Sequence, residues 1–513
     1  MQAYQMEPLP QAATREDPVR KRRSPALSFI DLLEPLLLLV VGALVLAPET
    51  TPPQTILIGL ASLLAPYLLR WIFYGAPSRS TLADLPLALL FLVLTPVSLW
   101  VTPYFWEATW PEFVRMAWGG AVFMGVINWA LPLWQQADST PAARYRLPLR
   151  LWLLTFAYLL LGVALALVGL VNMDTVTKIP FVDQVAAQLK TQDVTQLELA
   201  DQFNPNRVAA LLVLYAPLPL AFLLTTGRRT PPPPQRMTRP PRPSEQAPAR
   251  RRETLGRRLL QSGLAGLGRL ISKCFWLFLW LFFAGGLLLT QSRAGLLAAA
   301  VATIVVLLLT WRQPEGGLRL TGGLFVVLFL AGMGYFTLTI QYTDFFNGAA
   351  TTLDSTSAKM VNTASLQGRV IIWQRALNGL ADQPLTGLGL GAFDQIAHEP
   401  YPLPGYIPGD IHHAHNLFLQ TALDFGAPGL IVFLALVVLA ATSLIRLYRS
   451  APPGGQLSVW ATGLLGCFVA FVIYNLLDAL TLGGRPAVAL WFLLGLAMSA
   501  GAYAETTPAA PHS

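Results

Sequence analysis

Long apolar runs separated by short polar segments make up most of the chain. Each run is about 20 residues long, the length at which an α-helix crosses the hydrocarbon core of a bilayer. A backbone inside lipid must form its hydrogen bonds internally, which favours helices for such runs. The pattern therefore predicts an all-α polytopic membrane protein with about 12 transmembrane helices. They are expected at residues 27–47, 54–73, 82–101, 111–134, 148–172, 206–226, 268–290, 295–311, 321–340, 418–445, 459–478 and 486–503.

The composition supports a membrane protein over a soluble one. Hydrophobic residues make up 54% of the 513 residues and charged residues 12%, whereas soluble proteins carry about 25% charged residues. Cys274 and Cys467 both fall within expected helices, so neither a disulfide framework nor a cysteine metal motif is predicted. No basic soluble domain accompanies the net charge of +8, which argues against nucleic-acid binding.

Basic residues predict the orientation of the helices. Most of the 35 lysines and arginines fall in the polar segments that share one side with residues 20–23, the basic cluster before the first helix. Because cytoplasmic loops are enriched in lysine and arginine, this side is expected to be the cytoplasm. Both termini then lie in the cytoplasm, and the largest polar segment lies outside it.

The polar segments divide the chain into seven parts. Loops as long as the one before the tenth helix are usually functional, so this loop is expected to carry the catalytic residues. The expected parts are a disordered cytoplasmic tail (1–26), an N-terminal transmembrane bundle (27–226), a Pro- and Arg-rich cytoplasmic linker (227–267), transmembrane helices 7–9 (268–340), a large extracytoplasmic loop (341–417), transmembrane helices 10–12 (418–503) and a cytoplasmic tail (504–513).

Three short motifs occur in the large loop. The sequence SLQGRVIIWQRALNGL predicts a short amphipathic helix. Gly387, Gly389 and Gly391 alternate in the stretch that follows, which predicts a tight turn or a close approach of the backbone. They do not form a dinucleotide fingerprint, because no strand–helix context frames them. The sequence HHAH then places three of the five histidines just before an apolar run.

Cationic and imidazole side chains collect on the expected outer face. They are Arg293 in a short turn between two helices, Arg369, Arg375, His412, His413 and His415. Guanidinium groups bind phosphate oxygens in a bidentate manner, and an imidazole can transfer a proton near neutral pH. The cluster predicts a site for a phosphorylated, lipid-borne substrate. As alternatives, Arg293 reaches the lipid headgroups and His412 is a solvated loop residue.

These motifs resemble those of the O-antigen ligase and O-antigen polymerase family. In HNLFLQTALDFG, His415, Asn416, Leu419 and Gly426 match the family pattern H-[NSFG]-x-x-L-x(6)-G. QSRAG is similar to the family's Ser-Arg-Gly-type outer turn, with Ala294 where glycine is frequent. GRVIIWQRAL followed by PLTGLGLGAF resembles its Gly-Arg-x(3)-Trp segment and glycine-rich stretch, and NPNRVAALLVL resembles the start of an earlier helix. The resemblance covers residues 200–500.

The resemblance implies a metal-independent glycosyltransferase of the bacterial cytoplasmic (inner) membrane, with no cofactor and its active site on the outer face. Its donor would be a polyprenyl-diphosphate-linked glycan such as an undecaprenyl diphosphate glycan. Its acceptor would be a hydroxyl of a glycan, a lipid A core or a protein. His415 would be the catalytic base, and Arg293 and Arg369 would bind the diphosphate. Lesser candidates are Asn416, His413, Arg375 and Asp410.

Other functions stay open at this point. A repeat-unit polymerase of O-antigen or exopolysaccharide and a protein O-oligosaccharyltransferase need the same donor chemistry. A transporter or flippase for a lipid-linked sugar is the alternative of another class. Transporters carry ionisable residues and broken helices near the midplane. Here Asp31, Glu34 and Asp478 fall near helix ends, and Asp424 comes closest to a mid-helix position.

Overall fold

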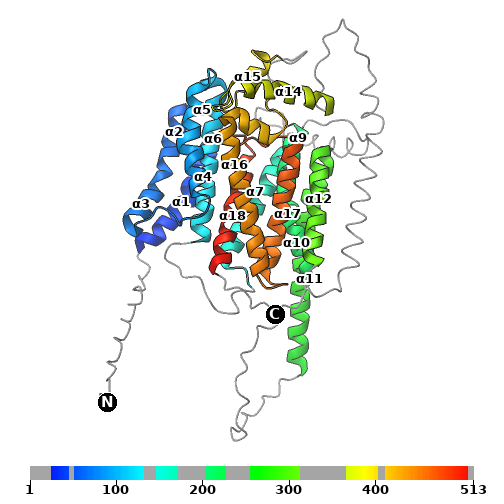
Figure 1. The fold of residues 1–513 in the computed structure, drawn as a ribbon. Coiled ribbons are helices and arrows are strands. Elements are labelled where there is room, and N and C mark those ends of the chain that lie inside the picture. Colours follow the sequence, from blue (N-terminus) through cyan, green and yellow to red (C-terminus); the bar gives the residue numbers. More distant parts are fainter. Residues whose placement is uncertain are drawn as a thin grey trace, which may run out of the picture.

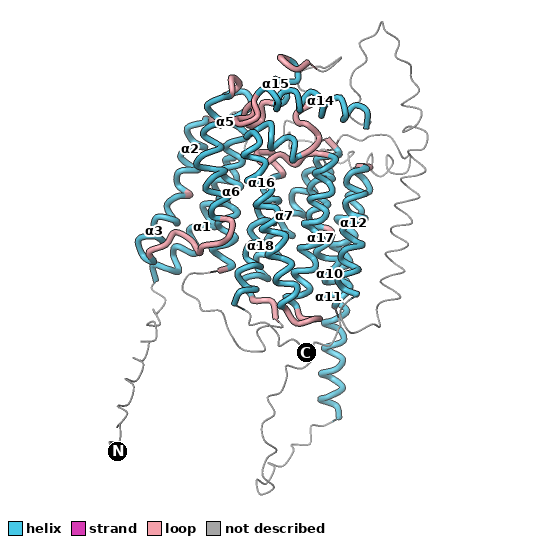
Figure 2. The backbone as a smooth tube through the Cα atoms, in the orientation of Figure 1, coloured by secondary structure: helices cyan, strands magenta, loops and turns pink. Residues whose placement is uncertain are grey.

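The computed structural model describes residues 25–45, 51–131, 146–171, 173, 204–226, 255–311, 366–402 and 411–506. Within these residues the chain is helical and contains no β-strand, as the sequence predicts. Nine of the described helical segments are long and apolar enough to cross a membrane. These segments stand side by side in one bundle (Figures 1 and 2).

The helices follow one another along the chain with short interruptions. Prolines mark several of the interruptions, because a proline lacks the N–H that continues a helix. The elements are α1 (Pro25–Val45), α2 (Pro53–Ser62), α3 (Leu64–Tyr74), α4 (Asp84–Ala88), the π-helix η1 (Leu89–Leu94), α5 (Thr95–Val101), the π-helix η2 (Phe105–Thr109), α6 (Trp110–Ala130), α7 (Leu149–Val171), α9 (Pro205–Tyr215), α10 (Pro217–Thr225), α11 (Leu255–Thr290), α12 (Arg293–Trp311), α14 (Leu366–Asp382), α15 (Phe393–His398), α16 (Leu417–Ser450), α17 (Gln456–Leu477) and α18 (Ala487–Thr506).

The prediction of 12 transmembrane helices is confirmed in part. Nine expected spans coincide with the nine candidate segments. Helices α1 and α6 form over the expected ranges but are not among the nine, and the expected helix 321–340 lies outside the described residues. Helix α11 begins at Leu255, inside the expected linker 227–267, because the leucines from residue 255 onward recur at helical spacing without a proline.

The middle of the bundle is formed by α9, α10, α17 and α18. In an apolar stretch of 18 residues within Pro205–Thr225, 89% of the residues are buried. In the corresponding stretch of Gln456–Leu477 the share is 83%. In Pro53–Tyr74 the share is only 17%, although its mean hydropathy of 1.8 is only slightly below the 2.2 and 2.0 of the other two segments. Apolar side chains that face outward are stable only against lipid, so the α2–α5 segment forms a lipid-facing edge.

A buried group of charged residues joins α1, α3 and α6. Arg70 Nη2 lies 2.6 Å from Glu34 Oε2, and both side chains are 2% exposed. Asn128 donates a hydrogen bond to Glu34 Oε1 at 3.1 Å, and Asp31 lies 3.8 Å from Arg70 Nη2. Charges in a low-dielectric interior persist only when they are paired, so this group fixes how the three helices pack.

Replacing Arg70 with alanine is expected to lower the free energy of unfolding by about 3–5 kcal/mol, because Glu34 would stay buried without its partner. Thermal unfolding of the protein in nanodiscs measures the loss. The double variant Arg70→Met with Glu34→Leu should recover most of it, since two apolar side chains leave no unpaired charge. A single variant as stable as the wild type would contradict a structural role for the pair.

Helices α14 and α15 lie across the end of the bundle at which α9, α12 and α16 begin (Figure 1). The predicted amphipathic helix is confirmed as α14. Its residues Ile372 and Ala376 are buried, while Val370 and Leu377 on the other side are exposed. The buried face packs in a small second core with side chains from α15, from α16 and from residues 411–416, the histidine loop. These side chains are Phe393, Ile396, Ala397, Ile411, Ala414 and Leu423.

Helix α16 is interrupted at Gly426, where φ is 72° and ψ is −177°. This conformation is essentially restricted to glycine. The segment after α14 fits into the interruption. Ala427 N–H donates to Pro384 O at 2.8 Å, and Leu388 N–H donates to Leu423 O at 2.6 Å. The loop therefore supplies the hydrogen bonds that the interrupted helix lacks.

The glycine-rich stretch lies directly on this interruption. Gly387, Gly389 and Gly391 all have positive φ, at 70°, 107° and 71°. A side chain on Gly387 would clash with the backbone of Leu423, and one on Gly389 would clash with Thr102. The predicted close approach of the backbone is thus confirmed at these positions.

Ser98 ties the same loop to the N-terminal part of the bundle. Its hydroxyl donates to Asp424 O at 2.7 Å and accepts from Leu390 N–H at 2.8 Å. Ser98 itself is fully buried in α5. Three segments far apart in the sequence therefore meet at one hydroxyl group.

Candidate active site

The histidine loop, residues 411–416, precedes α16 and packs against the end of α17. Asn416 caps α16, because its Oδ1 accepts a hydrogen bond from Leu419 N–H at 3.0 Å. Its Nδ2 donates to Leu476 O at 3.1 Å, which ties the cap to α17. His415 before it has φ of 48°, a left-handed conformation that turns the chain into the helix.

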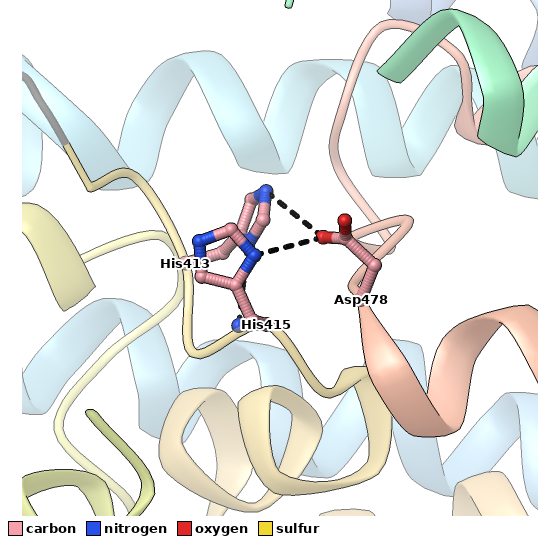
Figure 3. A group of neighbouring side chains, drawn as sticks. All are labelled: His413, His415 and Asp478. Atoms are coloured by element: carbon pink, nitrogen blue, oxygen red, sulfur yellow. Dashed lines mark hydrogen bonds and ion pairs between the residues drawn. The ribbon is translucent and has the colours of Figure 1, made fainter. Parts of the chain in front are cut away.

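His415 forms a buried pair with Asp478, the residue that follows α17. His415 Nδ1 lies 3.0 Å from Asp478 Oδ1 (Figure 3). Asp478 is 1% exposed, and Ala479 N–H donates to the same oxygen at 2.9 Å. An ionised carboxylate only accepts hydrogen bonds, so Nδ1 carries a proton, and in the neutral tautomer of this ring Nε2 carries the lone pair.

The charge of Asp478 is stabilised by its neighbours. Burial alone would raise the pKa of this carboxyl group. His415, His413 and Arg369 outweigh that effect and hold the pKa of Asp478 below its usual range. Asp478 is therefore an anion at neutral pH, which is the state that can orient an imidazole.

His413 lies beside His415 but has both ring nitrogens engaged. Its Nδ1 accepts a hydrogen bond from His415 N–H at 3.3 Å, and its Nε2 lies 3.9 Å from Asp478 Oδ1. The two rings are nearly perpendicular, with centroids 4.6 Å apart. Burial and the neighbouring His415 lower the pKa of His413 to about 3, so this ring is uncharged at neutral pH. Of the two imidazoles, His415 is the one whose Nε2 remains for proton uptake.

Arg369 reaches the same carboxylate from α14. Its Nη2 lies 3.8 Å from Asp478 Oδ2. Trp373, one turn further along, donates from Nε1 to Ala414 O at 3.0 Å and so fixes α14 to the histidine loop. Arg375 is exposed on another side of α14, because six residues on a helix place two side chains about 120° apart around its axis. The structure thus brings Arg369 to the histidines and leaves Arg375 at the surface.

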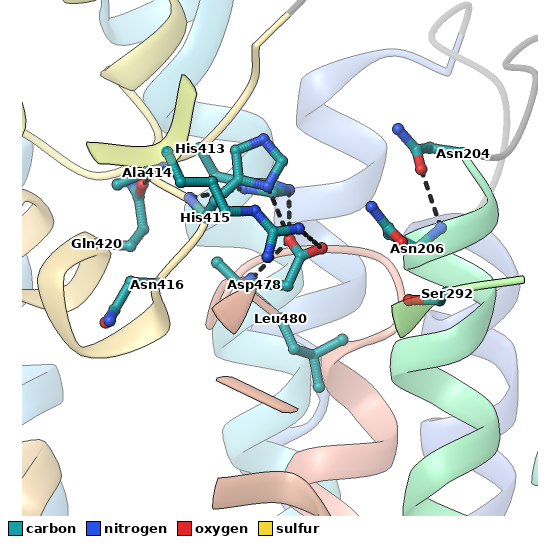
Figure 4. A network of polar contacts seen from close by, with 12 residues as sticks. Asn204, Asn206, Ser292, His413, Ala414, His415, Asn416, Gln420, Asp478 and Leu480 are labelled. Carbon is teal, nitrogen blue, oxygen red and sulfur yellow. Dashed lines mark hydrogen bonds and ion pairs between the residues drawn. The ribbon is translucent and has the colours of Figure 1, made fainter. Parts of the chain in front are cut away.

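The remaining candidates lie elsewhere. Arg293 is the half-buried first residue of α12, after a turn in which Gln291 has φ of 52°. Ser292 beside it stands at the same end of the bundle as Asn206 of α9, to the side of the histidine loop (Figure 4). Asp410 lies outside the described residues.

A cavity of about 650 Å³ opens next to the histidine loop. His412 and His413 line it, together with Arg207 from the first turn of α9. Arg207 is among the charges that lower the pKa of His413, after burial and His415. The wider lining comes from η2, α6, α9, α15, α16 and the segment after α17, and its other charged members are Glu112, Arg115, Asp394, Asp424 and Arg485.

Sequence reasoning did not single out Asp478 or Arg207 as site residues. Asp478 ends an apolar run, which is a common place for a carboxylate at a membrane surface. The sequence feature that could have identified Asp478 is a carboxylate at the end of the expected span 459–478, on the same expected side of the membrane as the histidines. Arg207 lies in NPNRVAALLVL, a stretch whose resemblance is only to the start of a helix and not to a site.

The histidines and Asp478 form a group that could hold a metal ion. One ligand atom from each of His413, His415 and Asp478 lies within 4.8 Å of the others, and two imidazoles with a carboxylate suit Zn²⁺. The guanidinium of Arg369 lies 3.8 Å from the same carboxylate, however. A cation there would be repelled by Arg369, so the group suits an anionic substrate better.

Comparison with known proteins identifies one stretch of the chain. Comparison with curated proteins gives no match. Residues 277–434 match the family model described as O-Antigen ligase. This range contains Arg293, Arg369 and His415, while Arg207 and Asp478 lie outside it. The resemblance predicted from the motifs is therefore confirmed over this range: this membrane protein carries an O-antigen ligase domain at residues 277–434.

Proposed function

We propose that the protein is an integral-membrane glycosyltransferase that transfers a glycan from a polyprenyl-diphosphate donor to an acceptor hydroxyl. The O-antigen ligase domain at residues 277–434 supports a glycosyltransferase-type enzyme that acts in polysaccharide biosynthesis. The observation that carries the finer proposal is the buried His415–Asp478 pair with Arg369 beside it. In this group the candidate base, His415, and a cation, Arg369, both lie beside the carboxylate of Asp478.

His415 is proposed to act as the general base. Its Nε2 would take the proton of the acceptor hydroxyl, and the hydroxyl oxygen would attack the anomeric carbon of the donor sugar. The bond from that carbon to the diphosphate oxygen would break, and the polyprenyl diphosphate would leave with the electron pair. Asp478 holds the ring in the required tautomer and stabilises the imidazolium that forms.

The arginines are proposed to bind the diphosphate. Negative charge grows on the leaving oxygen during the reaction, and a fixed guanidinium stabilises it without needing to reorganise. Arg369 stands beside Asp478, and Arg293 heads α12 at the same end of the bundle. We expect Arg369 to contribute more than Arg293, because it is the one that approaches the base.

The position of the group fits a lipid-linked substrate. The histidine loop comes immediately before α16, and Asp478 immediately after α17, both of which are candidate membrane spans. A polyprenyl-linked donor carries its diphosphate at the surface of the hydrocarbon core. The base is therefore at the depth where the anomeric carbon would be held. We propose that this is the outer face of the cytoplasmic membrane.

Release of free polyprenyl diphosphate tests the proposal. The purified full-length protein in liposomes would receive a polyprenyl-diphosphate glycan together with a lipid A core, a repeat-unit glycan or a Ser/Thr peptide. We expect release that requires one of the acceptors. A single shift of the lipid A core identifies a ligase, a product ladder a polymerase and a peptide shift a protein glycosylase. Movement of the donor between leaflets without release would replace the transferase with a transporter.

A further inference from the structure

We propose that the cavity beside the histidine loop is a sugar subsite in which Asp424 binds hydroxyl groups of a sugar unit. The proposal rests on the proposed function and names the part of the substrate that the cavity takes. A cavity of about 650 Å³ is within the range of about 300–1,000 Å³ typical of small-molecule sites. The sugar belongs either to the donor glycan or to the acceptor glycan, and the kinetic experiment below separates the two.

Asp424 presents a buried carboxylate to the cavity. The residue is 2% exposed and lines the cavity wall. Gln420 Nε2 donates to its Oδ1 at 2.8 Å, and Gly391 N–H donates to the same oxygen at 3.2 Å. Within the described part of the chain, no salt bridge is formed by Asp424. The other oxygen, Oδ2, is the one through which the carboxylate can accept hydrogen bonds from a ligand.

Sugar hydroxyl groups are suitable donors for this oxygen. A buried carboxyl group is unfavourable unless its hydrogen-bonding capacity is satisfied, and the protein supplies two of its hydrogen bonds. A sugar hydroxyl group both donates and accepts, so it can complete the hydrogen bonding of this group.

Further polar groups stand around Asp424 in the same wall. Gln395 of α15 has a buried Oε1 that accepts no hydrogen bond from any described residue. Glu112 of α6 lies close enough to interact electrostatically with Asp424. Its Oε1 accepts from Arg115 at 3.0 Å, which compensates its charge. The wall therefore offers carboxylate and carboxamide groups from three separate helices, the side-chain types that hydrogen-bond hydroxyl groups.

The wall is joined to the proposed base through Gln420. Its Oε1 accepts a hydrogen bond from Ala414 N–H at 2.9 Å, while its Nε2 holds Asp424. Ala414 is the residue between His413 and His415, and Gln420 stands beside it on α16 (Figure 4). His413 also lines the cavity. A sugar held at Asp424 would therefore extend from the neighbourhood of His415, where its bond is made or broken.

The variant Asp424→Asn tests the subsite with little change in shape. The amide oxygen can still accept from Gln420 and Gly391, but the NH₂ group replaces Oδ2 and can only donate. Asp382→Asn is the matched control, because Asp382 is exposed at the end of α14, binds Tyr401 and does not line the cavity. Both variants would be compared with the wild type in the liposome assay, first with the acceptor and then with the donor as the varied substrate.

Asp424→Asn is expected to raise KM for one of the two substrates about tenfold, with a much smaller change in kcat, because the hydrogen bonds that Oδ2 accepts from the sugar are lost. A rise in the acceptor series places the acceptor sugar at Asp424, and a rise in the donor series places the donor sugar there. Asp382→Asn should match the wild type in both. If Asp424→Asn also matches the wild type in both, the subsite is ruled out.

A binding measurement separates this proposal from the proposed function. Saturation-transfer NMR on the full-length protein in nanodiscs would use a neutral disaccharide as the probe, with Asp424→Asn and Asp382→Asn as the variants. We expect the disaccharide to bind the wild type and Asp382→Asn equally, and to bind Asp424→Asn about tenfold more weakly. This result would support the subsite even if no transfer occurred. Equal binding to Asp424→Asn and the wild type, or binding to neither, would overturn it.

Discussion

Replacing His415 with alanine is expected to lower the rate of glycan transfer by about 10²- to 10⁴-fold, because a positioned general base contributes that much to a reaction. The measurement is the initial rate of polyprenyl diphosphate release at saturating donor and acceptor. The side chain is only 8% exposed, so thermal unfolding of the variant is needed to check that the histidine loop still folds. Full activity in a folded variant would move the base to another residue.

The variant Asp478→Asn examines the same pair from the other side. The amide of this variant can accept a hydrogen bond from His415 Nδ1–H or donate one to Nδ1. In the second arrangement the ring proton lies on Nε2, which then cannot act as the base. We expect a loss of rate comparable to that of His415→Ala, and little further loss in the double variant, because the two residues act as a unit. Additive losses would show that Asp478 acts independently of the histidine.

The pH dependence of these variants can be assigned with the help of His413. Its pKa of about 3 keeps this ring uncharged at neutral pH. A loss of activity as the pH falls from 8 to about 5 would therefore not arise from protonation of His413. Such a loss should disappear in the residual activity of His415→Ala if His415 is the group that must be unprotonated.

Replacing Gly426 with alanine is expected to destabilise the protein by about 2–6 kcal/mol, through two separate costs. An alanine in this backbone conformation costs roughly 1–3 kcal/mol. Its Cβ would also clash with the backbone of Leu385, which cannot move without breaking the hydrogen bonds between the loop and α16, and overpacking of this kind costs about 1–3 kcal/mol more. Thermal unfolding in nanodiscs and the yield of folded protein measure the effect.

Gly454→Ala is the matched control for this substitution. Gly454 has φ of 76°, yet no atom lies within 4 Å of the position that its Cβ would take. It should show the conformational cost without the clash. Equal destabilisation by the two variants would mean that the packing of the loop into α16 contributes little to stability.

Much of the architecture could be predicted because it depends on local patterns. The length of the apolar runs predicted the spans, and the motif SLQGRVIIWQRALNGL predicted the amphipathic helix α14, but not that Ile372 and Ala376 form its buried face. The alternating glycines predicted a close backbone approach without indicating what approaches. His415 was singled out by its place before an apolar run, and α16 does begin two residues later. Its role as a base stays a prediction.

The parts that could not be predicted depend on contacts between distant residues. Asp478 is 63 positions from His415, and a carboxylate at the end of a span has no feature in the sequence that assigns it to a histidine. The choice between Arg369 and Arg375 depends on which side of α14 faces the bundle. The cavity is formed by residues of the N-terminal helices as well, such as Glu112, in a region where no motif was recognised.

The contacts of Ser98 also determine when the site can be completed during synthesis. This hydroxyl bonds to Leu390 and Asp424, which are 292 and 326 positions later in the chain. Asp478, the partner of His415, follows later still. Chains fold from the N-terminus as they emerge, and contacts of large sequence separation form late. When the N-terminal helices have just been inserted, Ser98 therefore still lacks Leu390 and Asp424 as hydrogen-bond partners. The histidine loop reaches its final position only after α17 has been inserted.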